Sequence, residues 1–99
     1  MPINQFIVGN ATDETLVGDI GDDVILGDEG NDLLIGDDGN DTMDGEAGND
    51  TLFGDAGNDW LKGEAGDDLI IGGEGDDLMQ GGDGDDTLDG EAGNDTLDG

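Results

Sequence analysis

Large apolar residues recur every nine positions along most of the chain, from Leu16 to Leu97. Between them lie six-residue runs rich in Gly, Asp, Asn and Glu. Starting at Gly9, the sequence divides without insertion into ten nine-residue repeats that end at Asp98. Gly fills the first place in all ten repeats and the fourth in nine; Asp fills the sixth in nine, and Leu, Ile or Met fills the eighth in all ten. Such a fixed phase indicates a repeat architecture rather than a biased composition.

Each repeat predicts a turn followed by a short strand. The first six places favour a turn, because glycine adopts positive φ without steric cost. The last three places, such as Leu33 to Ile35, favour a strand in which neighbouring side chains point to opposite faces. Only the eighth place is always apolar, so we expect it to face the interior. Glycine at the first and fourth places excludes a helix.

A three-residue strand followed by a tight turn must double back, so two repeats complete one coil of 18 residues. Strands two repeats apart then stack in parallel at about 4.8 Å. The expected fold class is all-β, with two facing parallel sheets, a thin aliphatic core and acidic turns along both flanks. Residues 9–99 would form this roll. Residues 1–8 would cap it through Ile3, Phe6, Ile7 and Val8.

The charge of the chain bears on whether this fold can form by itself. The chain has 29 acidic residues against one lysine, and a formal net charge of −28. Such a composition is typical of a disordered chain, so the sequence predicts disorder without a cation and folding with one. Without a basic patch, nucleic acid and anionic membranes are excluded as partners. The sequence predicts neither a membrane-spanning helix nor a cleavable signal peptide. The absence of Cys and His argues against a structural zinc site.

The repeats resemble the RTX, or hemolysin-type, calcium-binding repeat G-G-x-G-x-D-x-U-x across residues 9–98. The resemblance implies a right-handed parallel β-roll that binds about seven to eight calcium ions between successive turns. In such a roll, sixth-place Asp side chains and loop carbonyls of repeats n and n+2 share one ion. The side-chain ligands would then be Asp23, Asp32, Asp41, Asp50, Asp59, Asp68, Asp77, Asp86 and Asp95. The backbone ligands would be the carbonyls of Gly21, Gly30, Gly39, Gly48, Gly57, Gly66, Gly75, Gly84 and Gly93.

The pairing gives seven matched carboxylate pairs, from Asp23 with Asp41 to Asp77 with Asp95. An eighth pair, Glu14 with Asp32, matches less well, because Glu is one methylene longer and Thr12 replaces the loop glycine. Calcium suits these sites on physical grounds too, since it accepts six to eight mixed carboxylate and carbonyl oxygens, whereas magnesium demands a tight octahedron. The repeats depart from the family pattern at the second place, where glycine remains only at Gly73 and Gly82.

The outward-facing seventh and ninth places differ between the two expected sheets. The odd-numbered repeats carry an apolar stripe of Val17, Leu33, Ile35, Phe53, Leu69 and Ile71. Contiguous exposed apolar area of this kind favours self-association or docking on a neighbouring domain. The alternative is plain β-propensity, because exposed strands favour branched and aromatic residues anyway.

The residue types argue against an enzyme, because the sequence contains no His, Cys, Ser, Tyr or Arg. An EF-hand is excluded, since the glycine phase forbids its flanking helices. The leading prediction is a calcium-binding module that folds on calcium binding, with an extracellular location and export without a cleaved signal implied by the resemblance. The alternative is a calcium-braced scaffold for surface recognition or adhesion. Ice binding is a minor variant, because Leu33 and Leu69 interrupt the row of Thr15, Thr51 and Thr87.

Overall fold

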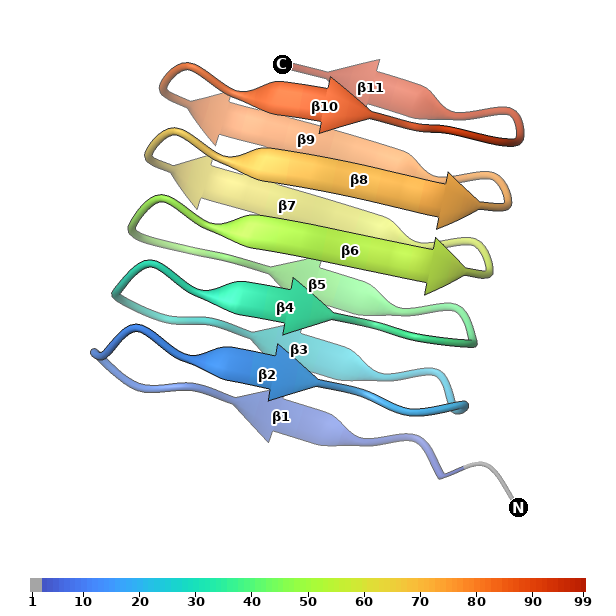
Figure 1. Ribbon diagram of the computed structural model, residues 1–99, viewed down its shortest axis with the longest axis horizontal. Coiled ribbons are helices and arrows are strands. Elements are labelled where there is room, and N and C mark those ends of the chain that lie inside the picture. The colour runs from blue at the N-terminus through green and yellow to red at the C-terminus, as the bar shows by residue number, and fades with distance from the viewer. Residues whose placement is uncertain (1–2) are drawn as a thin grey trace.

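The computed structural model describes residues 3–99, which form a two-sheet solenoid (Figure 1). Its strands are β1 (Phe6–Val8), β2 (Thr15–Val17), β3 (Val24–Leu26), β4 (Leu33–Ile35), β5 (Thr42–Asp44), β6 (Thr51–Ala56), β7 (Trp60–Ala65), β8 (Leu69–Glu74), β9 (Leu78–Asp83), β10 (Thr87–Asp89) and β11 (Thr96–Asp98). The six-stranded sheet has the order β1-β3-β5-β7-β9-β11, and the five-stranded sheet the order β10-β8-β6-β4-β2.

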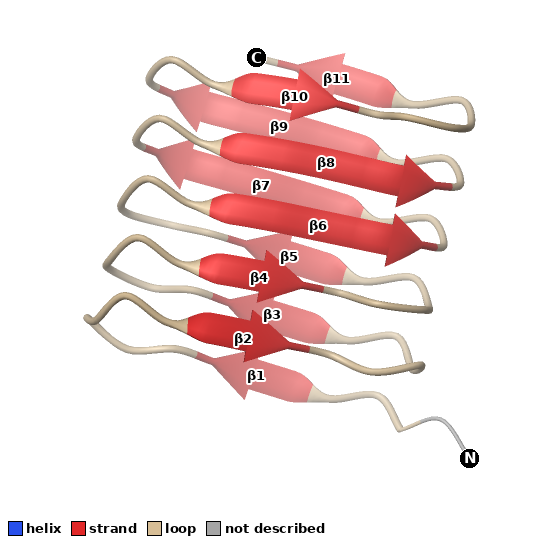
Figure 2. Cartoon of the chain, viewed as in Figure 1, coloured by secondary structure: helices blue, strands red, loops and turns tan. Residues whose placement is uncertain are grey.

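The strand register confirms the predicted coil. Every strand pairs in parallel with the strand two repeats away, as Leu34 does with Leu52, so partners are 18 residues apart. Within the described part of the chain every regular element is a strand, as Figure 2 shows, and none of these residues forms a helix that could span a membrane. The predicted all-β parallel roll is therefore confirmed.

The eighth-place side chains form the core between the two sheets. Seven of them are fully buried, with 0% exposure: Ile25, Leu34, Met43, Leu52, Leu61, Ile70 and Met79. Ile7, Leu16 and Leu88 are partly buried against this cluster, whereas Leu97, on the last coil, is 46% exposed. The molecule is a slab of 34 × 27 × 12 Å. A slab this thin holds one layer of side chains between its sheets, so contacts within the turns contribute much of its stability.

The segment expected to cap the N-terminal end is part of the ladder. Phe6–Val8 forms β1, which pairs with Val24–Leu26 of β3, and Ile7 packs against the core. Ile3 and Phe6 are 66% and 69% exposed. The signal for this strand was present in the sequence, because residues 4–8 (NQFIV) match the last five places of a repeat such as NDTLF. Residues 1 and 2 of the expected cap lie outside the described residues.

The central strands are longer than the sequence predicts. β6, β7, β8 and β9 each have six residues instead of three. The extra length comes from the second and third places, which also pair, as Asp55 does with Gly73 and Ala56 with Glu74. These turns are therefore tied together by backbone hydrogen bonds as well as by the strands.

Candidate metal centre

The sixth-place aspartates line both flanks of the roll, each directly before a strand. Seven of them are only 1–3% exposed: Asp23, Asp32, Asp41, Asp50, Asp59, Asp68 and Asp77. Carboxylates are seldom this buried without a partner. The repeat places them there because each turn closes onto the strand that carries the core residue two positions later.

One oxygen of each carboxylate is used to stack the coils. The backbone N–H of Asp23 donates to Oδ1 of Asp41 at 2.7 Å, and that of Asp41 donates to Oδ1 of Asp59 at 2.8 Å. The same bond joins all seven matched pairs predicted from the sequence. It also joins the backbone of Glu14 to Asp32, at 2.9 Å. The structure thus brings together every predicted pair.

In most of these carboxylates the second oxygen has no hydrogen-bond partner. Seven buried Oδ2 atoms accept no hydrogen bond, those of Asp32, Asp41, Asp50, Asp59, Asp68, Asp77 and Asp86. A buried acceptor left unsatisfied costs about 1–3 kcal/mol, and more when it is charged. One such atom lies in each turn from the third repeat to the ninth, and a cation bound there would satisfy it.

The unpartnered oxygens lie against the first-place glycine. A β-carbon added to Gly27 would lie 2.8 Å from Oδ2 of Asp32 and 2.8 Å from the carbonyl oxygen of Gly45, two repeats on. At Gly36 it would lie 3.0 Å from the carbonyl oxygen of Gly54 and would also meet Oδ2 of Asp41. At these two glycines a carboxylate oxygen of one repeat therefore lies close to a carbonyl oxygen of the repeat stacked on it.

These first-place carbonyls were not among the ligands expected from the sequence. In the turns described, neither Gly36 nor Gly45 accepts a backbone hydrogen bond through its carbonyl. The signal that could have pointed to them is the glycine that opens all ten repeats. A side chain at this place would clash with the sixth-place carboxylate oxygen, so the requirement for glycine is steric.

The fourth-place carbonyls, which were expected as ligands, face a different neighbour. The carbonyl oxygen of Gly21 lies against the α-carbon side of Gly39, and that of Gly30 lies in the same way against Gly48. They stack along the flank, whereas the first-place carbonyls lie next to Oδ2. The role of the fourth-place carbonyls as ligands stays a prediction.

The first two turns differ from the rest. There the second-place N–H donates to the sixth-place carboxylate, from Asn10 to Oε1 of Glu14 at 2.6 Å and from Asp19 to Oδ2 of Asp23 at 2.9 Å. From the third repeat on, the second-place residue has positive φ, for example 74° at Asp28, and no such bond forms. In the third to ninth repeats, a second-place residue with positive φ thus occurs together with a sixth-place Oδ2 that has no hydrogen-bond partner. The sequence predicts a well-matched ligand at Asp23 and a poorer one at Glu14, but in the structure both carboxylates accept the same backbone N–H bond.

The electrostatics of the flank are repulsive. Burial raises the pKa of the Asp41, Asp50 and Asp59 carboxyls to about 7 and that of Asp68 to about 6. Neighbouring carboxylates of the same ladder raise these pKa values further, while the backbone N–H bond lowers them. Among residues 3–99, no three acidic side chains converge closely enough to hold a metal by themselves. An ion in these turns must therefore take backbone carbonyls as ligands too.

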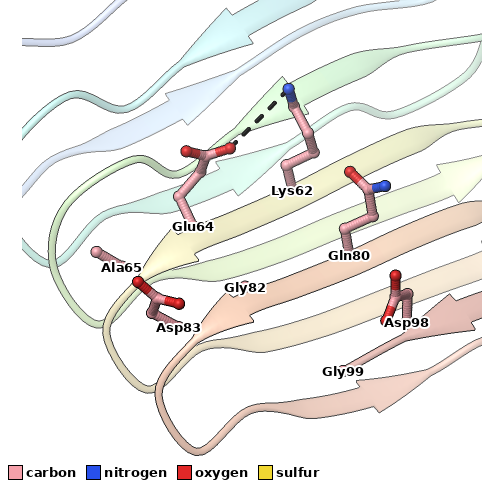
Figure 3. A pocket seen from close by; sticks show the side chains of 8 residues that line it. All are labelled: Lys62, Glu64, Ala65, Gln80, Gly82, Asp83, Asp98 and Gly99. Carbon is pink, nitrogen blue, oxygen red and sulfur yellow. Dashed lines mark ion pairs between the residues drawn. The ribbon is translucent and has the colours of Figure 1, made fainter.

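A separate depression of about 360 Å³ lies at the surface (Figure 3). Its lining residues are Lys62, Glu64, Ala65, Gln80, Gly82, Asp83, Asp98 and Gly99. Lys62 Nζ lies 4.0 Å from Glu64 and 3.8 Å from Asp44, and 5.1 Å from the centre of the Trp60 ring. No sixth-place aspartate lines it, so it is not part of the candidate metal centre.

The family comparison agrees with the geometry of the turns. The family model described as RTX calcium-binding nonapeptide repeat (4 copies) matches residues 8–43, 44–79 and 71–99. No curated protein and no solved structure matched the chain in the corresponding searches. The matched segments include every sixth-place aspartate, and repeats of this family are calcium-binding. The chain belongs to the RTX calcium-binding nonapeptide repeat family.

Proposed function

We propose that this chain is a calcium-responsive folding module, in which ions bound in the turns stabilise the roll and their removal unfolds it. The observation that carries the proposal is the series of seven buried, unpartnered Oδ2 atoms. A fold that leaves a charged acceptor unsatisfied in each turn is costly by itself. A cation that accepts these oxygens as ligands turns that cost into a source of stability.

The donor set fits calcium. At Gly27, Gly36 and Gly54 an aspartate Oδ2 lies close to a carbonyl of the repeat stacked on it, and Oδ2 is unpartnered in the turns from the third repeat to the ninth. Calcium accepts six to eight oxygens in flexible geometry, whereas magnesium retains water and demands an octahedron. The residues proposed to hold calcium are the sixth-place aspartates, together with first-place and fourth-place carbonyls. Glu14 and Asp23, whose carboxylates each accept a backbone N–H of their own turn, would contribute least.

Charge supports the same proposal. About eight divalent ions would reduce the formal net charge from −28 to about −12. Without them, carboxylates two repeats apart repel one another across a spacing of about 4.8 Å. Binding therefore removes both the unsatisfied acceptors and the repulsion between coils.

An extracellular setting follows from the affinity expected of such a module. Extracellular calcium modules bind at about 10⁻⁴–10⁻³ M, far above resting cytosolic calcium. The module would then stay unfolded inside the cell that makes it and fold after export. This location is part of the proposal and rests on the family.

A calcium titration followed by far-UV circular dichroism tests the proposal. We expect a disordered spectrum in EDTA and a cooperative change to β-structure as calcium rises through the millimolar range, with magnesium as the matched control. Calorimetry of the same titration counts the ions, for which we expect about seven to eight. A chain that is already β-structured in EDTA, or still disordered in saturating calcium, would refute the proposal.

A further inference from the structure

The turn at residues 18–23 has the same sequence pattern as three other turns but a different conformation. Residues 18–23, 27–32, 36–41 and 54–59 all read G-D-x-G-x-D, so their first, second, fourth and sixth places are identical. In the last three of these turns the second-place Asp has φ of 74°, 77° and 71°, and the fourth-place glycine also has positive φ. In the first of them neither place has positive φ. The residues that these turns share therefore allow two conformations.

Two hydrogen bonds within the turn close residues 18–23. Oδ1 of Asp19 accepts the backbone N–H of Gly21 at 3.1 Å, and the backbone N–H of Asp19 donates to Oδ2 of Asp23 at 2.9 Å. This pair of bonds is here called the Asp19 latch. In the other three G-D-x-G-x-D turns the sixth-place Oδ2 accepts no hydrogen bond. The latch thus distinguishes the closed turn from the three open ones.

The closed turn still has the oxygen atoms of the open turns. Asp23 is 1% exposed, and its Oδ1 accepts the backbone N–H of Gln5 on the neighbouring coil at 2.7 Å. A β-carbon added to Gly18 would meet Oδ2 of Asp23 and would lie 2.7 Å from the carbonyl oxygen of Gly36, in the turn stacked on it. The carboxylate and the carbonyl are therefore both in place. The N–H of Asp19 uses the carboxylate oxygen that a cation would take.

We infer that residues 18–23 form a latched calcium site, which binds its ion only when the Asp19 latch opens. The inference rests on the proposed binding of calcium by the open turns. A site that must first open has an apparent affinity reduced by the fraction of molecules in the open form. Opening breaks two hydrogen bonds, one of them to a carboxylate. The ion shared by Asp23 and Asp41 should therefore bind about tenfold or more weakly than the ions of the open turns.

The turn at residues 9–14 shows why the fourth-place glycine matters for such a site. Oδ1 of Asn10 accepts the N–H of Thr12 at 3.0 Å, and the N–H of Asn10 donates to Oε1 of Glu14 at 2.6 Å, so the same two bonds close it. Opening would require positive φ at Thr12, which a β-branched residue strongly disfavours. Glycine at this place, as at Gly21, has no such barrier. Of the two closed turns, only residues 18–23 can open to bind an ion.

Three variants separate the latch from the effects of charge and of glycine. Asp19→Gly removes the Oδ1 acceptor and lowers the cost of positive φ, and the roll tolerates glycine at this place, since Gly73 and Gly82 stand there. Asp19→Asn removes the same charge but keeps Oδ1, which Asn10 uses for this bond in the first turn. Asp28→Gly makes the same glycine substitution in an open turn, where φ is already 74°.

Equilibrium dialysis against radioactive calcium, with circular dichroism on each sample, tests the inference. Physiological ionic strength screens loose association of calcium with exposed carboxylates. We expect the wild-type chain to bind one ion about tenfold or more weakly than the others, after its β-structure is complete. In Asp19→Gly that ion should bind together with the others. Asp19→Asn and Asp28→Gly should keep it weak.

The outcomes that contradict the latch differ from those that contradict calcium binding. A wild-type chain whose ions all bind with one affinity would overturn the latch, and so would a weak ion that persists in Asp19→Gly. Equal tightening of that ion in Asp19→Asn would assign the effect to charge, and equal tightening in Asp28→Gly would assign it to glycine; either result also overturns the latch. A chain that binds no calcium and stays disordered would instead overturn the proposed function.

Discussion

Two adjacent aspartates in one turn, Asp67 and Asp68, have different roles. Oδ1 of Asp67 accepts the backbone N–H of Asp85 at 2.9 Å, and Oδ1 of Asp68 accepts that of Asp50 at 2.7 Å. Both therefore link one coil to another, in opposite directions along the roll. Asp67 is exposed, and Asn holds its place in several other repeats, whereas Asp68 is buried with an unpartnered Oδ2. Of the two, only Asp68 has a buried oxygen left without a hydrogen-bond partner.

This contrast gives a prediction with an internal control. Asp68→Asn keeps the Oδ1 acceptor but replaces Oδ2 with a donor, so we expect the number of bound ions to fall by about two, because Asp68 belongs to the pairs with Asp50 and Asp86. The calcium midpoint should rise several-fold. Asp67→Asn removes the same charge and should leave both quantities near the wild-type values. Calorimetric titration measures both; equal losses in the two variants would show that net charge, not the unpartnered oxygen, governs binding.

The buried carboxyls also predict an acid effect on the calcium-free chain. Burial raises the pKa of Asp41, Asp50 and Asp59 from 3.8 to about 7 in the folded state. The folded state therefore binds protons more tightly than the unfolded state, and its stability falls as pH rises from about 4 to about 7. In EDTA we expect β-structure to increase as pH is lowered through that window, measured by far-UV circular dichroism on dilute samples. An increase of β-structure with rising pH in EDTA would contradict this sign.

At the scale of the elements, the repeat phase was enough to predict the strands from β2 onward and the coil length, because the places of Leu34 and Asp32 recur along the chain. The pairing of the aspartates was implied instead by the resemblance to the RTX repeat. The turn conformation could not be predicted in this way, because its second place mixes Gly73 and Gly82 with Asp and Glu. That place has positive φ from Asp28 onward, and the resulting backbone path decides which carbonyl faces the carboxylate.

Acidic residues at these left-handed positions predict a stabilising substitution. Glu46 has φ of 68°, a conformation that costs a residue with a β-carbon about 1 kcal/mol or more and costs glycine almost nothing. Glu46→Gly should therefore stabilise the calcium-loaded roll by about 1 kcal/mol, less the extra entropy that glycine gives the unfolded chain. Glu46→Gln removes the same charge but keeps the strain, so it is the matched control. Urea unfolding in saturating calcium compares the two; an equal gain in both variants would assign the effect to charge.

At the scale of the whole molecule, two causes could keep the calcium-free chain unfolded. One is the mutual repulsion of a −28 chain, which salt screens, since the Debye length is about 3 Å at about 1 M ionic strength. The other is the need of each buried Oδ2 for a ligand, which monovalent salt does not meet. The thin core, with seven fully buried aliphatic and Met side chains, offers little to offset either.

Small-angle scattering separates these causes. The folded roll has a Cα radius of gyration of 11.9 Å, whereas an unfolded chain of about 100 residues has about 30 Å. We expect the expanded value in EDTA, a modest contraction in about 1 M sodium chloride as repulsion is screened, and the compact value only with calcium. Dilute samples keep association from enlarging the compact form. A chain that reached the compact value in sodium chloride alone would show that repulsion, and not ligation of the aspartates, is what calcium relieves.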